Sequence, residues 1–169
     1  QDRPHNWTEG EVEIALEIGQ RTWLAVEKAK IEEENKLLLS KVIEEREKLN
    51  TIINSVDAEV WVSDHLGNVT LINPIAQNSL GLDMNKKSIQ EAIDQIEVFE
   101  LDGSPRPTSH APLLKSLKGE TIIGEEIMRH PITKELRHRS FISSPIKGEN
   151  KNITGAVAIA KDITEEVRI

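Results

Sequence analysis

Residues 60–73 read VWVSDHLGNVTLIN and mark the point where the chain changes its hydrophobic period. Residues 60–64 and 69–73 are rich in β-branched and aromatic residues that alternate with polar ones, which is typical of β-strands. The segment HLGN at residues 65–68 is typical of a tight turn between two strands. The stretch therefore predicts a β-hairpin that opens a globular domain.

Downstream of this hairpin, the sequence predicts helices first and strands afterwards. Three short helical segments each have a capping or terminating residue: residues 74–80 before Gly81, residues 88–96 from the capping box of Ser88 and Glu91, and residues 109–117 from Ser109 to Gly119. Strands are expected at 122–130, 136–146 and 153–163, and alternating alanines with Val157 and Ile159 make the last one a central strand. Strands at both ends of a helical middle predict an α+β domain with one antiparallel sheet and helices on one face.

Upstream of the hairpin, the chain lacks helix breakers over a long stretch. Residues 20–66 contain no glycine and residues 5–73 contain no proline. Thr8 and Glu11 form a capping box, and strong helix formers dominate as far as Asn54. A continuous helix of this length spans about 70 Å. It is too long to lie on a small domain, so we expect it to pair with another helix.

Apolar residues in this helix repeat at spacings of three and four, which predicts a parallel two-stranded coiled coil. The predicted dimer seam consists of Ile31, Asn35, Leu38, Val42, Leu49, Ile52 and Val56. A buried asparagine such as Asn35 fixes register in such seams. Small residues between Val12 and Ala29 follow a different phase, which indicates a stutter near residues 29–34. The alternative is a solvated helix that packs on its own domain.

Composition excludes several classes of function. The net charge of −8 disfavours nucleic acid and anionic membrane surfaces as partners. The absence of cysteine excludes disulfides, thiol nucleophiles and cysteine zinc sites. No apolar run approaches the roughly 20 residues of a membrane span, and no secretory signal pattern opens the chain. We therefore expect a cytoplasmic setting, without membrane contact by this part of the protein.

Several short motifs follow one another along the second part of the chain. They are Asp64-x-x-Gly67, Asn73-x-x-Ala76-x-x-x-Leu80-Gly81, Leu101-Asp102-Gly103-x-Pro105, Pro112-Leu113 with Leu117-x-Gly119-Glu120, Ser144-Pro145-Ile146, Gly155-Ala156-Val157 and Asp162-Ile163-Thr164. In this order, they make residues 48–169 resemble a PAS domain. The resemblance implies a PAS-like five-stranded antiparallel sheet, a small internal pocket and parallel dimers. It also implies that Asp162, Ile163 and Thr164 relay a signal to a following helix.

The start of the chain carries a second resemblance. Arg3-Pro4, Trp7-Thr8, Glu11, Arg21-Thr22-Trp23 and Ala25-Val26-Glu27 resemble the last helix of a GAF domain. We therefore expect a long signalling helix at residues 1–55, made of the end of a GAF domain and a coiled-coil linker. A PAS sensor domain at 56–169 is expected to follow it. The resemblance implies a multidomain GAF–PAS sensor, most often a histidine kinase, with a GAF core upstream and an output module downstream.

A pocket is expected between the sheet and the short helices. Strand alternation and helix faces suggest that Trp61, Ile72, Ile93, Phe99, His110, Leu114, Ile127 and Phe141 line it. His110 is either a haem ligand or a surface histidine near a helix start. The alternatives to haem are a small metabolite or no cofactor at all. His130 and His138, with neighbouring arginines, could bind an anion or a metal across two strands, or could simply be solvated.

No catalytic residue is assigned, because the chain has no G-x-S-x-G elbow and no Gly-rich phosphate loop. No metal site is assigned either. The expected function is signal sensing and signal relay without enzymatic activity in this part of the protein. Two alternatives remain open. The pocket is the primary input of a ligand- or haem-binding sensor, or the chain is an inert dimerisation spacer.

Overall fold

The computed structural model describes residues 6–81 and 87–168, and Arg3 and Pro4 of the GAF resemblance lie outside these ranges. The chain divides into two units between Asn50 and Thr51, five residues before the boundary expected from the sequence. Within the described residues, every helix is too short or too polar to cross a membrane.

Helix α1 comprises Glu9–Ser55 and begins at the predicted capping box. The Thr8 hydroxyl accepts the N–H of Glu11 at 3.3 Å, and the Glu11 carboxylate accepts the N–H of Thr8 at 2.8 Å. At 47 residues the helix is about 70 Å long. None of its described side chains is buried within the single chain.

The end of α1 corrects one member of the predicted seam, because Val56 lies beyond the last helical residue. The buried side chain of Asn73 holds the segment that follows. Its amide donates to the backbone carbonyls of Ile53 and Ala58, at 3.2 and 2.8 Å, and its oxygen accepts the N–H of Val60 at 3.0 Å. Asn73 thus connects the last residues of α1 to the start of β1 by hydrogen bonds within the second unit.

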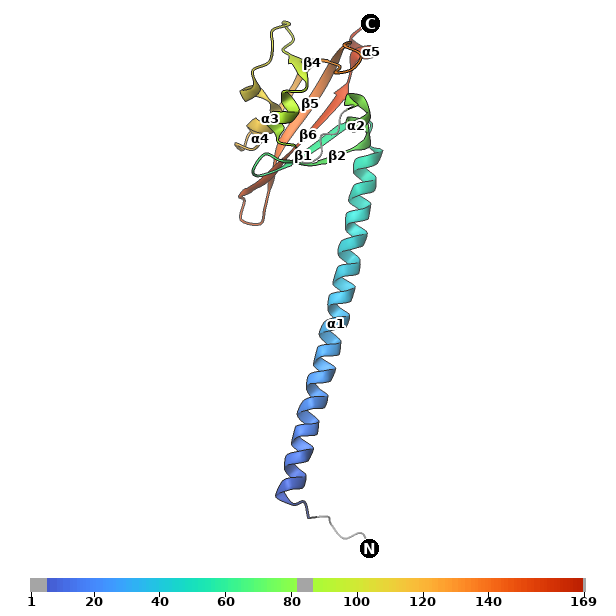
Figure 1. Cartoon of the computed structure of the whole chain (residues 1–169), viewed down its shortest axis with the longest axis vertical. Helices are drawn as coiled ribbons and strands as arrows, with labels where there is room; N and C mark the ends of the chain where they lie inside the picture. Colours follow the sequence, from blue (N-terminus) through green and yellow to red (C-terminus); the bar gives the residue numbers. More distant parts are fainter. Residues whose placement is uncertain (1–5, 82–86, 169) are drawn as a thin grey trace. The chain divides into compact units, whose positions relative to one another are not determined.

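The sheet has six antiparallel strands in the order β2-β1-β6-β5-β4-β3, with β6 in a central position as predicted (Figure 1). Their bounds are β1 Glu59–Asp64, β2 Val69–Ile72, β3 Glu97–Phe99, β4 Ile122–Arg129, β5 Leu136–Lys147 and β6 Ile153–Asp162. The expectation of five strands was wrong by one edge strand. Strand β3 pairs with β4 from Glu97 to Phe99, in a segment too short to show an alternating pattern.

Short helices cover one face of this sheet, as predicted. They are α2 (Pro74–Leu80), α3 (Ile89–Ile93), the 3-10 turn η1 (Thr108–His110) and α4 (Pro112–Ser116). Figure 1 shows α3 and α4 on the same side of the sheet. The buried core joins apolar side chains of these helices to Trp61, Met128 and Ala156 on the inner face of the sheet. Helix α5 (Thr164–Val167) follows β6.

Two capping predictions hold and one fails. Gly81 ends α2 at φ +63°, and the Ser88–Glu91 capping box opens α3. Ser109, however, lies inside η1, and α4 begins after Ala111 without a side-chain cap. Pro112 occupies the first turn of α4, where its missing N–H costs nothing, and this proline marks the start of the helix in place of a serine cap.

Candidate functional site

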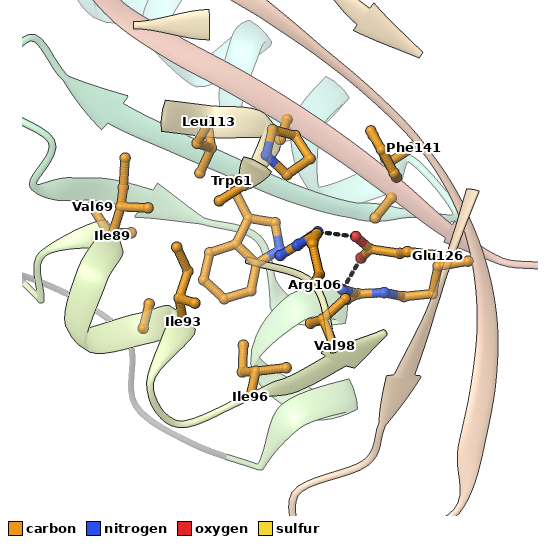
Figure 2. Close-up of a pocket in the computed structure, with 16 residues that line it drawn as sticks. Trp61, Val69, Ile89, Ile93, Ile96, Val98, Arg106, Leu113, Glu126 and Phe141 are labelled. Carbon is orange, nitrogen blue, oxygen red and sulfur yellow. Dashed lines mark hydrogen bonds and ion pairs between the residues drawn. The ribbon is translucent and has the colours of Figure 1, made fainter. Parts of the chain in front are cut away.

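A cavity of about 90 Å³ lies between the inner face of the sheet and the short helices. Figure 2 shows aliphatic side chains such as Val69, Ile89 and Ile93 at one end and the polar pair Arg106 and Glu126 at the other. The complete lining consists of Trp61, Val69, Ile89, Ala92, Ile93, Ile96, Val98, Arg106, Ala111, Pro112, Leu113, Glu126, Arg139, Phe141, Ala158 and Ala160. The pocket is thus mainly apolar, with charged groups concentrated in one place.

Four charged residues, which we call the buried quartet, form a chain of alternating sign beside this pocket: Arg106, Glu126, Arg139 and Glu59. The carboxylate of Glu126 bridges the guanidinium groups of Arg106 and Arg139 (Figure 2). Arg139 also donates to Glu59 at 2.9 Å. All four side chains are at most 10% exposed, so their charges compensate one another inside the domain.

Three strands and one loop position the quartet. Glu126 and Arg139 face each other across the β4–β5 ladder, and Glu59 starts β1. Arg106 arrives from the loop after β3, where its backbone N–H donates to the carbonyl of Val98 at 2.9 Å. Glu59 is further held by Ser79 of α2, whose hydroxyl donates at 2.5 Å, and by the indole N–H of Trp61 at 3.3 Å.

The pKa values of the two buried arginines move in opposite directions. Burial lowers the pKa of Arg106 from its ordinary value, although the carboxylate of Glu126 opposes the change. Burial acts to lower the pKa of Arg139 as well, but Glu126 and Glu59 outweigh it and the pKa is raised. Both guanidinium groups remain charged at any physiological pH. The two positive charges of the quartet are therefore always present, and the two ionised carboxylates balance them.

The structure brings together three of the predicted pocket residues: Trp61, Ile93 and Phe141. Ile72 is buried in the core but does not reach the pocket. Ile127 and Phe99 pair with each other on β4 and β3 and also lie outside the lining. Leu114 packs against the core from α4. On β4, the inward positions belong to Glu126 and Met128, so the assumed inward position of Ile127 was one residue out of phase.

His110 does not reach the pocket. Its side chain is 53% exposed and lies 3.7 Å from the carboxylate of Glu100. Histidine is absent from the lining formed by the described residues. A cavity smaller than the roughly 150 Å³ that holds benzene in another protein also leaves no room for a haem. The residues of this pocket therefore do not fit a haem group.

The basic strand residues also differ from expectation. His130 is buried at the end of β4, where its Nδ1 accepts the N–H groups of Ile132 and Thr133 at 3.2 and 3.1 Å. Arg139, one of the neighbouring arginines for which anion binding or solvation was expected, is instead buried in the quartet. Across residues 6–81 and 87–168, no group of three or more His, Asp or Glu side chains is arranged to hold a metal ion.

Glu59, Arg106 and Glu126 were not foreseen as functional residues. A usable signal was present for Glu126 alone. It shares the inward phase of β4 with Met128, and the tight turn at 131–134 sets it opposite Arg139. Opposite charges at directly paired strand positions commonly attract. Nothing local in the sequence indicates that Arg106, twenty residues before Glu126, closes over the same carboxylate.

The Asp162-Ile163-Thr164 motif forms the exit from β6 and is held by β5. The N–H of Ile163 donates to the carbonyl of His138 at 2.8 Å, and the hydroxyl of Thr164 accepts the N–H of His138 at 2.9 Å. Asp162 accepts the N–H and hydroxyl of Thr164 at 2.9 and 2.5 Å. Thr164 is the first residue of α5, and its N–H donates to the Asp162 carboxylate two residues earlier.

The basic neighbour of Asp162 is Arg137 of β5, at 3.9 Å. Arg137 lies near Asp162 because β5 and β6 are paired from Arg139–Asp162 onward, which places the preceding residues of β5 beside the exit.

The other predicted seam residues lie on α1 with their side chains exposed: Ile31, Asn35, Leu38, Val42, Leu49 and Ile52. Apolar side chains outside the seam, including Leu37, Leu39 and Ile43, are exposed to a similar degree. Exposure within a single chain therefore does not distinguish the seam from the rest of the helix.

Comparison with solved structures defines the class of fold. The PAS domain of a protein from Colwellia psychrerythraea is 21% identical, with a TM-score of 0.52 over 73% of this chain and 98% of that one. The PAS domain of Bordetella pertussis BvgS is 19% identical, with a TM-score of 0.54 over 76% and 92%. The PAS domain of an HTR-like protein from Haloarcula marismortui is 18% identical, with a TM-score of 0.53 over 76% and 99%.

No protein-family model and no curated protein matches the chain. The chain has a PAS-like α+β fold, an antiparallel sheet with helices on one face, preceded by a long N-terminal helix.

Proposed function

We propose that this chain is a signal-sensing and signal-relay module of a multidomain cytoplasmic sensor, of the GAF–PAS histidine kinase type. In this proposal, α1 forms a parallel homodimer and brings in a signal from an upstream GAF core. The PAS-like domain modulates it, and Asp162, Ile163 and Thr164 transmit it to a downstream output module. The chain itself catalyses no reaction.

One observation carries the proposal. The segment 137–139 of β5 contacts both the pocket and the exit. Arg139 lines the pocket and belongs to the buried quartet, while the backbone of the adjacent His138 holds Ile163 and Thr164. A displacement of Arg139 by a pocket occupant would therefore act directly on the two hydrogen bonds that fix the start of α5. The cavity also favours a sensing role over an inert spacer.

Replacing Asp162 in the full multidomain protein tests the relay. Asp162→Ala removes the carboxylate that accepts both the N–H and the hydroxyl of Thr164, so output should no longer follow input while the fold is retained. Thr164→Ser keeps a hydroxyl for the same contacts and should retain regulation, whereas Thr164→Val should not. Glu149→Ala, in the exposed β5–β6 turn, is the matched control. Normal regulation in a folded Asp162→Ala protein would contradict the proposal.

A further inference from the structure

The quartet constrains the charge of anything that enters the pocket. Two guanidinium groups and two carboxylates already compensate one another, with side chains at most 10% exposed. An anionic or cationic occupant would add a charge without a counter-charge in an apolar setting, and such burial is costly. A neutral occupant leaves the balance undisturbed.

One donor of the quartet is left unused. Arg139 is 6% exposed, and its terminal nitrogens bind Glu126 and Glu59. Its Nε–H is buried, and no hydrogen-bond acceptor is found for it among the described residues. Buried donors are rarely left without an acceptor, because desolvation without a hydrogen bond is unfavourable. Arg139 lines the cavity, while its Nε has almost no accessible surface, so an occupant that displaces the neighbouring side chains can supply the missing acceptor.

The volume and the apolar lining of the cavity further restrict which molecules can bind. A volume of about 90 Å³ exceeds the roughly 10–15 Å³ that a single water needs and is below the roughly 150 Å³ of a benzene-binding cavity. Side chains such as Trp61, Ile89, Ile93 and Phe141 supply an apolar surround. The space therefore suits a compact molecule of a few non-hydrogen atoms with an apolar body.

We propose that the pocket binds a compact, neutral, mainly apolar molecule whose carbonyl-type oxygen or ring nitrogen accepts the Nε–H of Arg139. This inference rests on the proposed function in taking the pocket as an input site. It adds the chemical class of the ligand and the residue that selects it.

Three small probes with equal numbers of non-hydrogen atoms separate the possible classes. Cyclobutanone is neutral with one acceptor, methylenecyclobutane replaces that oxygen by a methylene group, and propionate carries a charge. Each is titrated into the 169-residue chain while the ¹H–¹⁵N resonance of the Arg139 Nε–H is followed by NMR. Cyclobutanone should shift this resonance saturably, with an affinity about tenfold above that of methylenecyclobutane, as expected for one hydrogen bond. Propionate should give no saturable shift.

Two variants locate the binding site. Ala158→Val adds two carbons to a lining residue without altering any charge and should abolish the cyclobutanone shift. Val157→Ile makes a similar change on the opposite face of β6 and should bind like the natural sequence, with amide dispersion confirming both folds. Equal binding of ketone and alkene, tighter binding of propionate, or no saturable shift with any probe would overturn the inference. Those results leave the relay untouched, because the Asp162→Ala experiment reads regulation and not ligand binding.

Discussion

At the scale of single residues, the position of Glu126 is the unusual feature of this domain. Its carboxylate is buried between the guanidinium groups of Arg106 and Arg139 and pairs with both. Buried ion pairs contribute little net stability compared with well-packed apolar residues. Removing one partner is different, because it leaves a charge without compensation in a medium that solvates it poorly.

Glu126→Gln should therefore destabilise the domain by about 3–5 kcal/mol, since it keeps the shape of the side chain but leaves an excess positive charge. Glu125→Gln changes the neighbouring, exposed carboxylate on the other face of β4, and its effect should stay within about 0.5 kcal/mol. Denaturant unfolding of the two variants measures both values. Similar stabilities of the two would show that the quartet is not coupled to the fold.

Residue-scale features divide clearly into those that sequence predicts and those that it does not. The capping boxes at Thr8 and Ser88 were predictable, because donor and acceptor lie three residues apart. The contact between Arg106 and Glu126 was not, because it depends on where the loop after β3 crosses the sheet. The inward face of β4 was only partly predictable. The hydrophobic rule placed Ile127 inward, whereas in the structure the charged Glu126 occupies an inward position.

At the scale of elements, β1 and β6 approach each other closely at Gly155. Gly155 pairs with Asp64, and a Cβ on it would come within 2.2 Å of the Ser63 carbonyl oxygen. Steric exclusion of any side chain at this position thus explains the glycine of the motif Gly155-Ala156-Val157. Ala156, the next residue, is fully buried in the core cluster that contains Trp61.

Gly155→Ala should weaken the pairing of these strands and cost about 3 kcal/mol, at the upper end of overpacking effects, because the clashing atom is backbone. Gly19→Ala is the contrasting substitution, since open space surrounds this glycine on α1. It should stabilise the helix by up to about 1 kcal/mol. Thermal unfolding followed by circular dichroism distinguishes the two signs, and a stabilising Gly155→Ala would contradict the observed register.

Most elements were predictable, and the exceptions share a cause. The hairpin, α2 and the three long strands follow from hydrophobic period and turn residues. Strand β3 and the turn η1 are three residues long, so neither carries a periodic pattern. Strand β3 forms because it pairs with the edge of β4, which is a tertiary and not a local cause.

At the scale of the whole molecule, the sequence predicts buried apolar side chains along the long helix, whereas the single chain leaves them exposed. Seam residues such as Ile31, Leu38 and Leu49 are 52%, 59% and 57% exposed. A 47-residue helix with such side chains in water is marginal by itself, because helices gain most of their stability by packing an apolar face. A second copy of the chain, aligned in parallel, covers this seam in our proposal.

The chain should accordingly be a dimer in light scattering at micromolar concentration. Leu38→Glu combined with Leu49→Glu should produce monomers, because a charge buried in the seam has no partner there. Leu39→Glu, at an equally exposed position outside the seam, should leave the dimer intact. Monomers of the natural sequence, or equal dissociation by Leu39→Glu, would refute the assigned seam.

In the proposed mechanism, the pocket and the exit motif are coupled through β5. The most direct measurement is amide hydrogen exchange at Ile163, whose N–H donates to His138. Filling the pocket by Ala158→Val should change this exchange rate by about fivefold, or roughly 1 kcal/mol, after correction for global stability. Val157→Ile should leave the rate unchanged. An unchanged rate in folded Ala158→Val protein would contradict coupling between pocket and exit.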